Sequence, residues 1–374
     1  MKLVKKLTIL ILVVVCLFST FACGESGKQE VNELGVPSSQ GFETGELSRC
    51  VWDMKLWDGV LYVGGGDYNK NTGPVSLWAY SLKDKQWKIS ASLPDEAITR
   101  FLVLNGQLIV PGVDPIENWE LGNYYRLENG EWKVHRVLPG AVHTFDAIQH
   151  NGIVFMGIGT NGQNYPAMIS YDGGTTFSTT PFYKNGVFCD LLVYEYSRTY
   201  ELFVFNDRVY ALVYNKQFDG EYNVEMYVFD DGAFSFVKCV DNFCKFGNIS
   251  VNMLNAKGQF KDKFFISSDY LYVSNSLNQF DKVKLPQDEN ASQFRVIDGK
   301  LYVLSYKPHE KEEDKYKIRM YVSDSGVDNF KQVFSFDYDV HPLCFEKNGD
   351  VFYVGMGTKT ITHQNNGMVL EVRL

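Results

Sequence analysis

The chain has 374 residues and a formal net charge of -9, and 45% of its residues are hydrophobic, 22% charged and 15% aromatic. This balance excludes a disordered chain, a collagen-like chain and a membrane protein with several spans. With 23 Tyr and 27 Phe, the composition favours β-strands. Since all-β folds often exceed the usual domain size, we first look for one large domain built from repeats.

Residues 1–22 have the composition of an export signal. Lysines stand at positions 2, 5 and 6, an apolar run follows over 7–18, and small and aromatic residues precede Cys23. The apolar run is shorter than the roughly 20 residues that a membrane-spanning helix needs. We therefore predict that residues 1–22 are a signal peptide.

The pair Ala22-Cys23 resembles the cleavage site of bacterial lipoproteins, where a small residue precedes a cysteine that is lipidated. Thr20 and Phe21 depart from the commonest form of this motif, so ordinary secretion is the alternative. The resemblance implies a lipid on Cys23, a flexible tether over 23–40, and a domain that is attached to a membrane of the cell envelope and faces away from the cytoplasm.

The charge of the exported part argues against nucleic acid as a partner. Loss of residues 1–22 removes three lysines and no acidic residue, which leaves 33 basic and 45 acidic side chains. A phosphate backbone requires a basic face, and the sequence has no cluster of Lys or Arg with interleaved aromatic residues.

Seven similar β-hairpins recur along the rest of the chain. In each, an apolar strand leads into a short polar turn, often Asn-Gly or Asp-Gly, and a second apolar strand follows. The turns are expected at residues 58–59, 105–106, 151–152, 206–207, 261–262, 298–299 and 348–349.

A second marker lies between these hairpins, an aromatic residue that opens another amphipathic strand. It occurs at Phe42, Trp87, Trp132, Phe177, Phe234, Phe280 and Phe330, at spacings of 45 to 57 residues. A period of this length suits four short strands. Units of this kind bury both faces only by stacking, so we predict a seven-bladed β-propeller of four-stranded antiparallel blades over residues 41–374.

The two ends of the chain suggest how the ring closes. The last unit stops before its outer strand, and Phe42 precedes any complete unit. We therefore predict that an N-terminal strand at residues 41–47 completes the seventh blade.

Residues 170–177 read Ser-Tyr-Asp-Gly-Gly-Thr-Thr-Phe and resemble the Asp-box of sialidase-like (BNR) propellers. The resemblance implies a shared fold, with Asp172 accepting backbone hydrogen bonds across the turn and Phe177 packing between sheets. It does not imply sialidase chemistry, because the nearest match to the aromatic-Arg-Ile-Pro signature, at residues 294–297, lacks the proline.

Ligands of propellers usually meet the face made by the loops that enter the innermost strands and by those that join the second and third strands. Aromatic residues expected on this face are Tyr68, Trp119, Tyr124 and Tyr165. Polar residues expected around the central channel are Arg49, Asp53, Arg100, His143, Asp146 and His341. No metal or cofactor is predicted, because no histidines or cysteines have ligand spacing. Cys239 and Cys244 are close enough in sequence for a local disulfide.

The sequence thus predicts an envelope-tethered propeller that binds a glycan or an extracellular or envelope protein and is not catalytic. Two alternatives remain open. One is a glycoside hydrolase or lyase in which Asp53 and Asp146 act as acid and base. The other is a purely structural scaffold.

Overall fold

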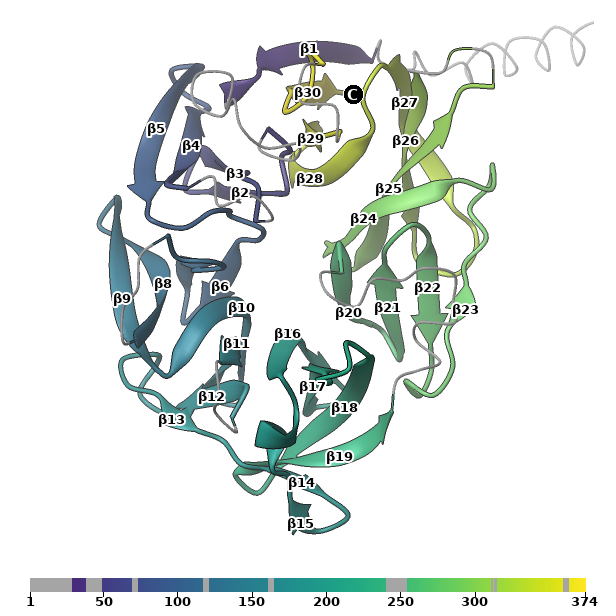
Figure 1. The fold of residues 1–374 in the computed structure, drawn as a ribbon. Helices are drawn as coiled ribbons and strands as arrows, with labels where there is room; N and C mark the ends of the chain where they lie inside the picture. The colour runs from purple at the N-terminus through teal and green to yellow at the C-terminus, as the bar shows by residue number, and fades with distance from the viewer. Residues whose placement is uncertain are drawn as a thin grey trace, which may run out of the picture.

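The computed structural model describes residues 29–37, 49–68, 73–116, 121–160, 165–239, 254–310, 312, 315–358 and 363–374. Apart from short 3-10 turns, the regular structure in these ranges is entirely β. Five sheets have four strands each, one has ten, and all are arranged in a ring (Figure 1). The protein is therefore an all-β propeller.

The sheets follow one another around the ring in chain order (Figure 1). The first contains β2 (Asp53–Trp57), β3 (Val60–Gly64), β4 (Val75–Ser81) and β5 (Gln86–Leu93). The second contains β6 (Leu102–Leu104), β7 (Gln107–Pro111), β8 (Leu121–Glu128) and β9 (Glu131–Pro139).

The ten-stranded sheet contains two four-stranded meanders. One is β10 (Ala141–His150), β11 (Ile153–Thr160), β12 (Ala167–Ser170) and β13 (Ser178–Thr179), and the other is β16 (Tyr196–Phe205), β17 (Arg208–Lys216), β18 (Tyr222–Asp230) and β19 (Ala233–Cys239). Two residue pairs join β11 to β16. The hairpin of β14 (Phe182–Lys184) and β15 (Val187–Phe188) is added beside β19.

The remaining sheets complete the ring. One contains β20 (Ala256–Phe260), β21 (Lys263–Ser267), β22 (Leu271–Ser274) and β23 (Asp281–Lys282). The next contains β24 (Asn290–Ile297), β25 (Lys300–Pro308), β26 (Tyr316–Ser323) and β27 (Lys331–Tyr338). The last contains β28 (Pro342–Asn348), β29 (Val351–Met356), β30 (Val369–Arg373) and, from the other end of the chain, β1 (Glu30–Gly35).

The expected hairpin turns join the first and second strands of the sheets. In the turn between β6 and β7, Asn105 and Gly106 have φ of 50° and 69°. Both central residues have positive φ at five of the seven turns, as the type I′ turn requires. The last turn lies at residues 349–350, one residue later than expected, because Asn348 still pairs with Val351.

The aromatic markers open the outermost strands. Trp87, Trp132 and Phe234 lie in β5, β9 and β19, and Phe177, Phe280 and Phe330 directly precede β13, β23 and β27. Two of the markers pack on the preceding sheet: Trp132 on Tyr62 of β3, with ring centroids 5.6 Å apart, and Phe177 on Tyr124 of β8, at 6.3 Å. The period seen in the sequence is therefore the period of the sheets.

The turn at residues 170–177 has the hydrogen bonds expected of it. The Asp172 carboxylate accepts the backbone N–H groups of Thr175 and Thr176, at 3.0 and 2.9 Å, and the hydroxyl of Ser170, at 2.7 Å. The hydroxyl and backbone N–H of Thr176 contribute most to lowering the pKa of Asp172. The carboxylate therefore ties the turn together.

An N-terminal strand closes the ring, but it is not the strand that we predicted. Strand β1 pairs antiparallel with β30, with Val31 opposite Val372 and Glu33 opposite Leu370. The predicted strand, residues 41–47, lies outside the described residues, and residues 30–35, which we assigned to the tether, belong to the fold instead. The outermost position of β1 explains the error, because a strand that is exposed or half-buried along its length carries little apolar pattern.

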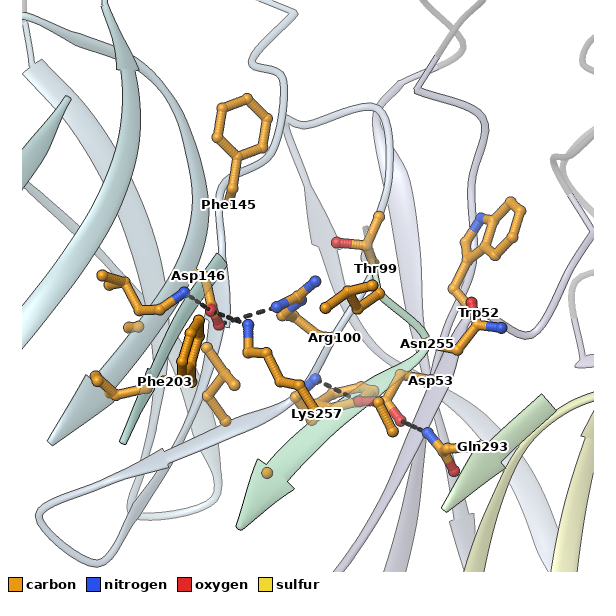
Figure 2. A pocket seen from close by; sticks show the side chains of 18 of the residues that line it. Trp52, Asp53, Thr99, Arg100, Phe145, Asp146, Phe203, Asn255, Lys257 and Gln293 are labelled. Carbon is orange, nitrogen blue, oxygen red and sulfur yellow. Dashed lines mark hydrogen bonds and ion pairs between the residues drawn. The ribbon is translucent and has the colours of Figure 1, made fainter. Parts of the chain in front are cut away.

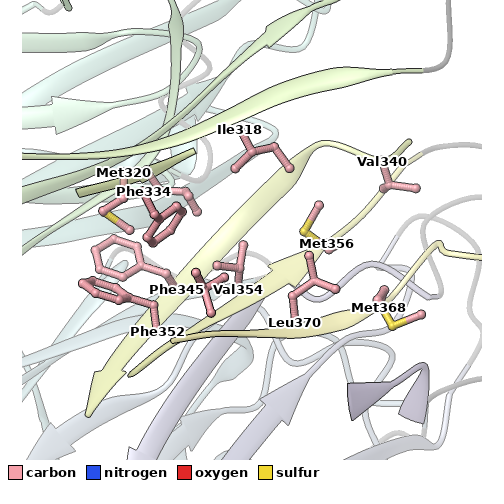
Figure 3. Close-up of a cluster of buried hydrophobic side chains, with 12 residues drawn as sticks. Ile318, Met320, Phe334, Val340, Phe345, Phe352, Val354, Met356, Met368 and Leu370 are labelled. Atoms are coloured by element: carbon pink, nitrogen blue, oxygen red, sulfur yellow. The ribbon is translucent and has the colours of Figure 1, made fainter. Parts of the chain in front are cut away.

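The core lies between neighbouring sheets. Figure 3 shows the cluster where Met320 and Phe334 of the β24–β27 sheet meet Phe345, Phe352 and other apolar side chains of the last sheet. Phe345 and Phe352 have no exposed surface. Radial stacking of sheets thus supplies the burial that no single sheet achieves.

Some predictions concern residues outside the described ranges. These are the signal peptide over 1–22, the lipidated Cys23, Trp119, and Cys244 as the partner of Cys239. Within the described ranges, no helix is both long enough and apolar enough to cross a membrane.

Candidate functional site

A central cavity of about 1290 Å³ lies on the axis of the ring. Every innermost strand contributes to its wall, namely β2, β6, β10, β16, β20, β24 and β28. The two-residue turns lie at one end of these strands. The chain enters them at the other end, where the loops β3–β4 and β7–β8 contribute Tyr68 and Asp114 to the cavity wall.

Four charged side chains form a buried cluster on one side of the cavity, which we call the four-charge cluster: Arg100, Asp146, Glu201 and Lys257. Figure 2 shows Arg100, Asp146 and Lys257. Arg100 contacts Asp146 Oδ1 and Glu201 Oε1, both at 3.0 Å. The Lys257 ammonium contacts a carboxylate oxygen of each acid. The cluster has two positive and two negative charges, and its carboxylates are almost completely buried.

The cations hold Asp146 in its charged form. Burial by itself raises the pKa of Asp146, but Lys257 and Arg100 outweigh burial, so the pKa lies below its usual range. The two carboxylates likewise raise the pKa of Arg100, against the effect of burial. Every charge in the cluster is therefore compensated by a direct partner.

A second cluster of charged side chains, also without net charge, spans β2, β24 and β28. Arg295 contacts Asp53 Oδ1 at 3.1 Å and Glu346 Oε1 at 2.9 Å, and Lys55 contacts the same Glu346 oxygen at 3.4 Å. Burial lowers the pKa of Arg295, but Glu346 and Asp53 raise it by more. Figure 2 also shows Gln293, whose side chain donates to Asp53 at 3.5 Å.

Several of these side chains also tie neighbouring parts of the ring together. At four places, a carboxylate or amide oxygen on an innermost strand accepts a backbone N–H from the next sheet or meander around the ring, or from the segment that enters it. The pairs are Asp53 with Phe101 (2.8 Å), Asp146 with Leu202 (2.7 Å), Glu201 with Leu254 (2.8 Å) and Gln293 with Phe345 (2.9 Å). β-Bulges directly precede three of the four acceptors. The polar wall of the cavity is thus part of the architecture.

The end of the cavity where the chain enters the innermost strands is aromatic. We call it the aromatic mouth and define it by Trp52, Tyr68, His143, Phe145, Arg198 and Tyr200, all of which line the cavity. Trp52 and Tyr68 have ring centroids 5.9 Å apart, and those of Phe145 and Tyr200 are 4.4 Å apart. His143 stacks on Phe145 at 5.5 Å. The mouth therefore presents aromatic rings above the neutralised charges of the deeper wall.

The predicted site residues divide between the cavity and other places. Asp53, Arg100, His143 and Asp146 line the cavity, as does Tyr68. Tyr124 is instead in the core, where its hydroxyl donates to the Gly174 carbonyl at 2.7 Å. The rest of the predicted residues that the structure describes are outside the cavity wall: Arg49, Tyr165 and His341.

Those three residues have other surroundings. His341 stacks on Tyr306, with centroids 5.1 Å apart, and burial lowers its pKa. Arg49 lines a small recess together with Cys50 and Val63. Tyr165 contacts the ring of Phe188 on β15, with centroids 6.1 Å apart. None of these positions gives the side chain access to the central cavity.

Sequence reasoning missed Trp52, Arg198, Glu201 and Lys257. A usable signal existed for Glu201, because it stands five residues before its hairpin turn, as do Asp53, Arg100, Asp146 and Gln293. Counting back from each turn would have identified this ring of polar side chains. Arg198 has no such signal, because it lies near the start of β16, before the position at which polar side chains recur.

Comparisons with known proteins support the fold only. No family model and no curated protein matches the sequence. A chain in the mitotic checkpoint complex has a TM-score of 0.50 at 7% identity, over 92% of this chain and 93% of that chain. The β-propeller domain of the Trilobed protease from Pyrococcus furiosus has a TM-score of 0.46 at 11% identity, over 82% and 90% of the two chains. The resemblances to lipoproteins and Asp-box proteins therefore stay predictions.

A buried carboxylate outside the cavity wall makes stability depend on pH. Burial raises the pKa of Asp95 to about 6, despite hydrogen bonds from Tyr125 and Asn123. Because the folded state then binds a proton more readily than the unfolded state, lowering the pH favours folding. Between pH 7 and pH 5, the wild type should gain about 1 kcal/mol of unfolding free energy relative to Asp95→Asn. Urea unfolding of both proteins at both pH values measures this, and an unchanged difference would contradict it.

Proposed function

We propose that the protein is a seven-bladed propeller, held at the cell envelope by a lipid on Cys23, that binds a glycan in the aromatic mouth. Counting the two meanders of the ten-stranded sheet as separate blades supports the number seven, since five further four-stranded sheets are present. The lipid and the location rest on the sequence of the first 23 residues.

The observation that carries glycan binding is the combination of aromatic rings with a deep, polar cavity. Sugar rings present C–H faces that pack on aromatic side chains, and their hydroxyls need hydrogen-bonding groups. Trp52 and Tyr68 supply half-buried rings at the mouth, and Thr99 and Asn255 are polar groups in the wall (Figure 2). The volume of about 1290 Å³ is sufficient for several sugar units.

A protein partner fits this geometry less well. A stable protein interface covers about 800 Å² on each partner and is usually built on a broad surface. The aromatic groups here line a concave site instead. Binding of an envelope protein with no response to sugars would contradict the glycan proposal.

Glycoside hydrolysis is also less well supported than binding. A general acid needs a raised pKa, whereas Lys257 and Arg100 lower the pKa of Asp146. Asp53 belongs to the other ion-pair cluster, with Arg295. Turnover of a fluorogenic glycoside that disappears in Asp146→Asn or in Asp53→Asn would favour an enzyme.

Replacement of Trp52 by Ala should weaken glycan binding by up to about tenfold, because it removes an aromatic face from the mouth. Screening the purified protein on a glycan array identifies a ligand, and calorimetric titration with that ligand measures the effect. Tyr171→Ala is the matched control, since Tyr171 is 66% exposed and does not line the cavity. Equal losses in the two variants, or none in Trp52→Ala, would contradict the assignment of the mouth.

A further inference from the structure

Arg198 differs from the arginines deeper in the cavity because it has no acidic partner. Arg100 and Arg295 each contact two carboxylates. Within the part of the chain that the structure describes, no carboxylate oxygen lies within 4.0 Å of the Arg198 guanidinium, whose hydrogen-bond partners are Tyr200 and His143. Arg198 is half-buried and lines the cavity, so a positive charge without a direct acidic partner faces the mouth.

Neutral groups hold this charge in place. The Arg198 guanidinium lies 4.2 Å from the centroid of the Tyr196 ring and 5.9 Å from that of Phe145. One terminal nitrogen donates to the Tyr200 hydroxyl at 3.2 Å, and the other lies 3.3 Å from His143 Nε2. These contacts fix the guanidinium without neutralising its charge.

The surroundings of His143 determine which of its ring nitrogens carries the proton. Its Nδ1 lies 2.9 Å from the Val113 carbonyl and 3.2 Å from Asp114 Oδ1, both of which are acceptors. Nδ1 therefore carries the proton, and Nε2 accepts from Arg198. Tyr200 and His143 use two of the five guanidinium N–H donors, and the others have no hydrogen-bond acceptor among the described residues.

We infer that the mouth selects an acidic sugar, one that carries a carboxylate or a sulfate, and that Arg198 binds its anionic group. This inference rests on the proposed glycan function and specifies its ligand. A guanidinium matches two oxygens of such a group at once. The aromatic rings that surround Arg198 favour a sugar over an acidic peptide, because a peptide of Asp or Glu has no comparable face to pack on them. The chain has a net charge of -9, so the attraction must be local to Arg198.

The test compares acidic sugars with uncharged ones. Binding of a galacturonate tetramer, its methyl ester, a heparin-derived tetrasaccharide and a neutral galactose tetramer is measured with the wild type, Arg198→Gln and Arg198→Lys. Lys133→Gln serves as the control, because Lys133 is an exposed cation outside the cavity. A tetraglutamate peptide is the competing ligand, and melting temperatures show that each variant is folded.

We expect an acidic tetramer, carboxylated or sulfated, to bind about 10- to 100-fold more tightly than the uncharged sugars. Arg198→Gln should abolish this preference, Arg198→Lys should retain part of it, and Lys133→Gln should leave it unchanged. If acidic and neutral sugars bind alike, or if the preference survives in Arg198→Gln, the inference is wrong while glycan binding stands. If tetraglutamate binds more tightly than any of the sugars, the ligand is an acidic peptide and the inference is wrong. If none of these sugars binds, the inference is wrong, and the glycan array decides whether the proposed function stands.

Discussion

A chain that begins at residue 37 is expected to unfold at a clearly lower urea concentration than one that begins at residue 29. The first lacks β1, which pairs with β30 over five residues. The Leu34 carbonyl also accepts the indole N–H of Trp87 at 2.7 Å, and Glu33 accepts the Tyr338 hydroxyl at 2.7 Å. At about 0.5–1.5 kcal/mol for each hydrogen bond, losing the two side-chain bonds and those of the five paired residues should cost at least about 3 kcal/mol.

The chain that begins at residue 29 is the control, because it keeps β1 and loses only residues outside the described ranges. A synthetic peptide of residues 29–37 should restore stability to the shorter chain, since β30 then has an open edge for it. Equal unfolding midpoints of the two chains would show that β1 does not close the ring. Closure by another strand would then have to be sought in residues 38–48.

Lys257→Met should lower the unfolding free energy at pH 7 by about 3–5 kcal/mol, because it leaves two buried carboxylates with one cation. Asp146 and Glu201 have 1% and 0% of their side-chain surface exposed, so water cannot replace the missing ammonium. Urea unfolding measures the loss. Lys257→Met combined with Glu201→Gln should recover a large part of it, since one positive and one negative charge then remain.

The pH dependence of the same variant has a defined sign. In the wild type the pKa of Asp146 is lowered, so its stabilising contribution is present at neutral pH and is lost as the pH falls through that low value. Without Lys257, which lowers the pKa of Asp146, this buried carboxylate binds a proton more readily. The deficit of Lys257→Met should therefore shrink between pH 7 and pH 4. A deficit that is constant with pH, or a double variant no more stable than Lys257→Met, would mean that lost packing and not charge causes the effect.

Part of the candidate site could be predicted from the sequence, because its residues recur at the same position in several repeats. Arg100 and Asp146 stand five residues before Asn-Gly turns, and the structure places both in the cavity wall. Lys257 stands four residues before its turn and therefore breaks the pattern. It was missed because only the neighbouring sheets supply the carboxylates that make a buried lysine tolerable.

The sequence by itself determined the all-β class, the turns and the period of the sheets. Each of these depends on local chemistry: residues such as Asn105-Gly106 readily adopt the positive φ of a two-residue turn, and an aromatic residue such as Trp132 lies at or just before the start of six outermost strands. Only the tertiary structure decided that residues 30–35 close the ring, and which of the charges in the cavity are paired. Both depend on contacts between residues far apart in the chain, such as Arg100 with Glu201, and no local pattern specifies the partner. For the same reason, only the fold shows where the described carboxylates lie, and therefore that none of them pairs with Arg198.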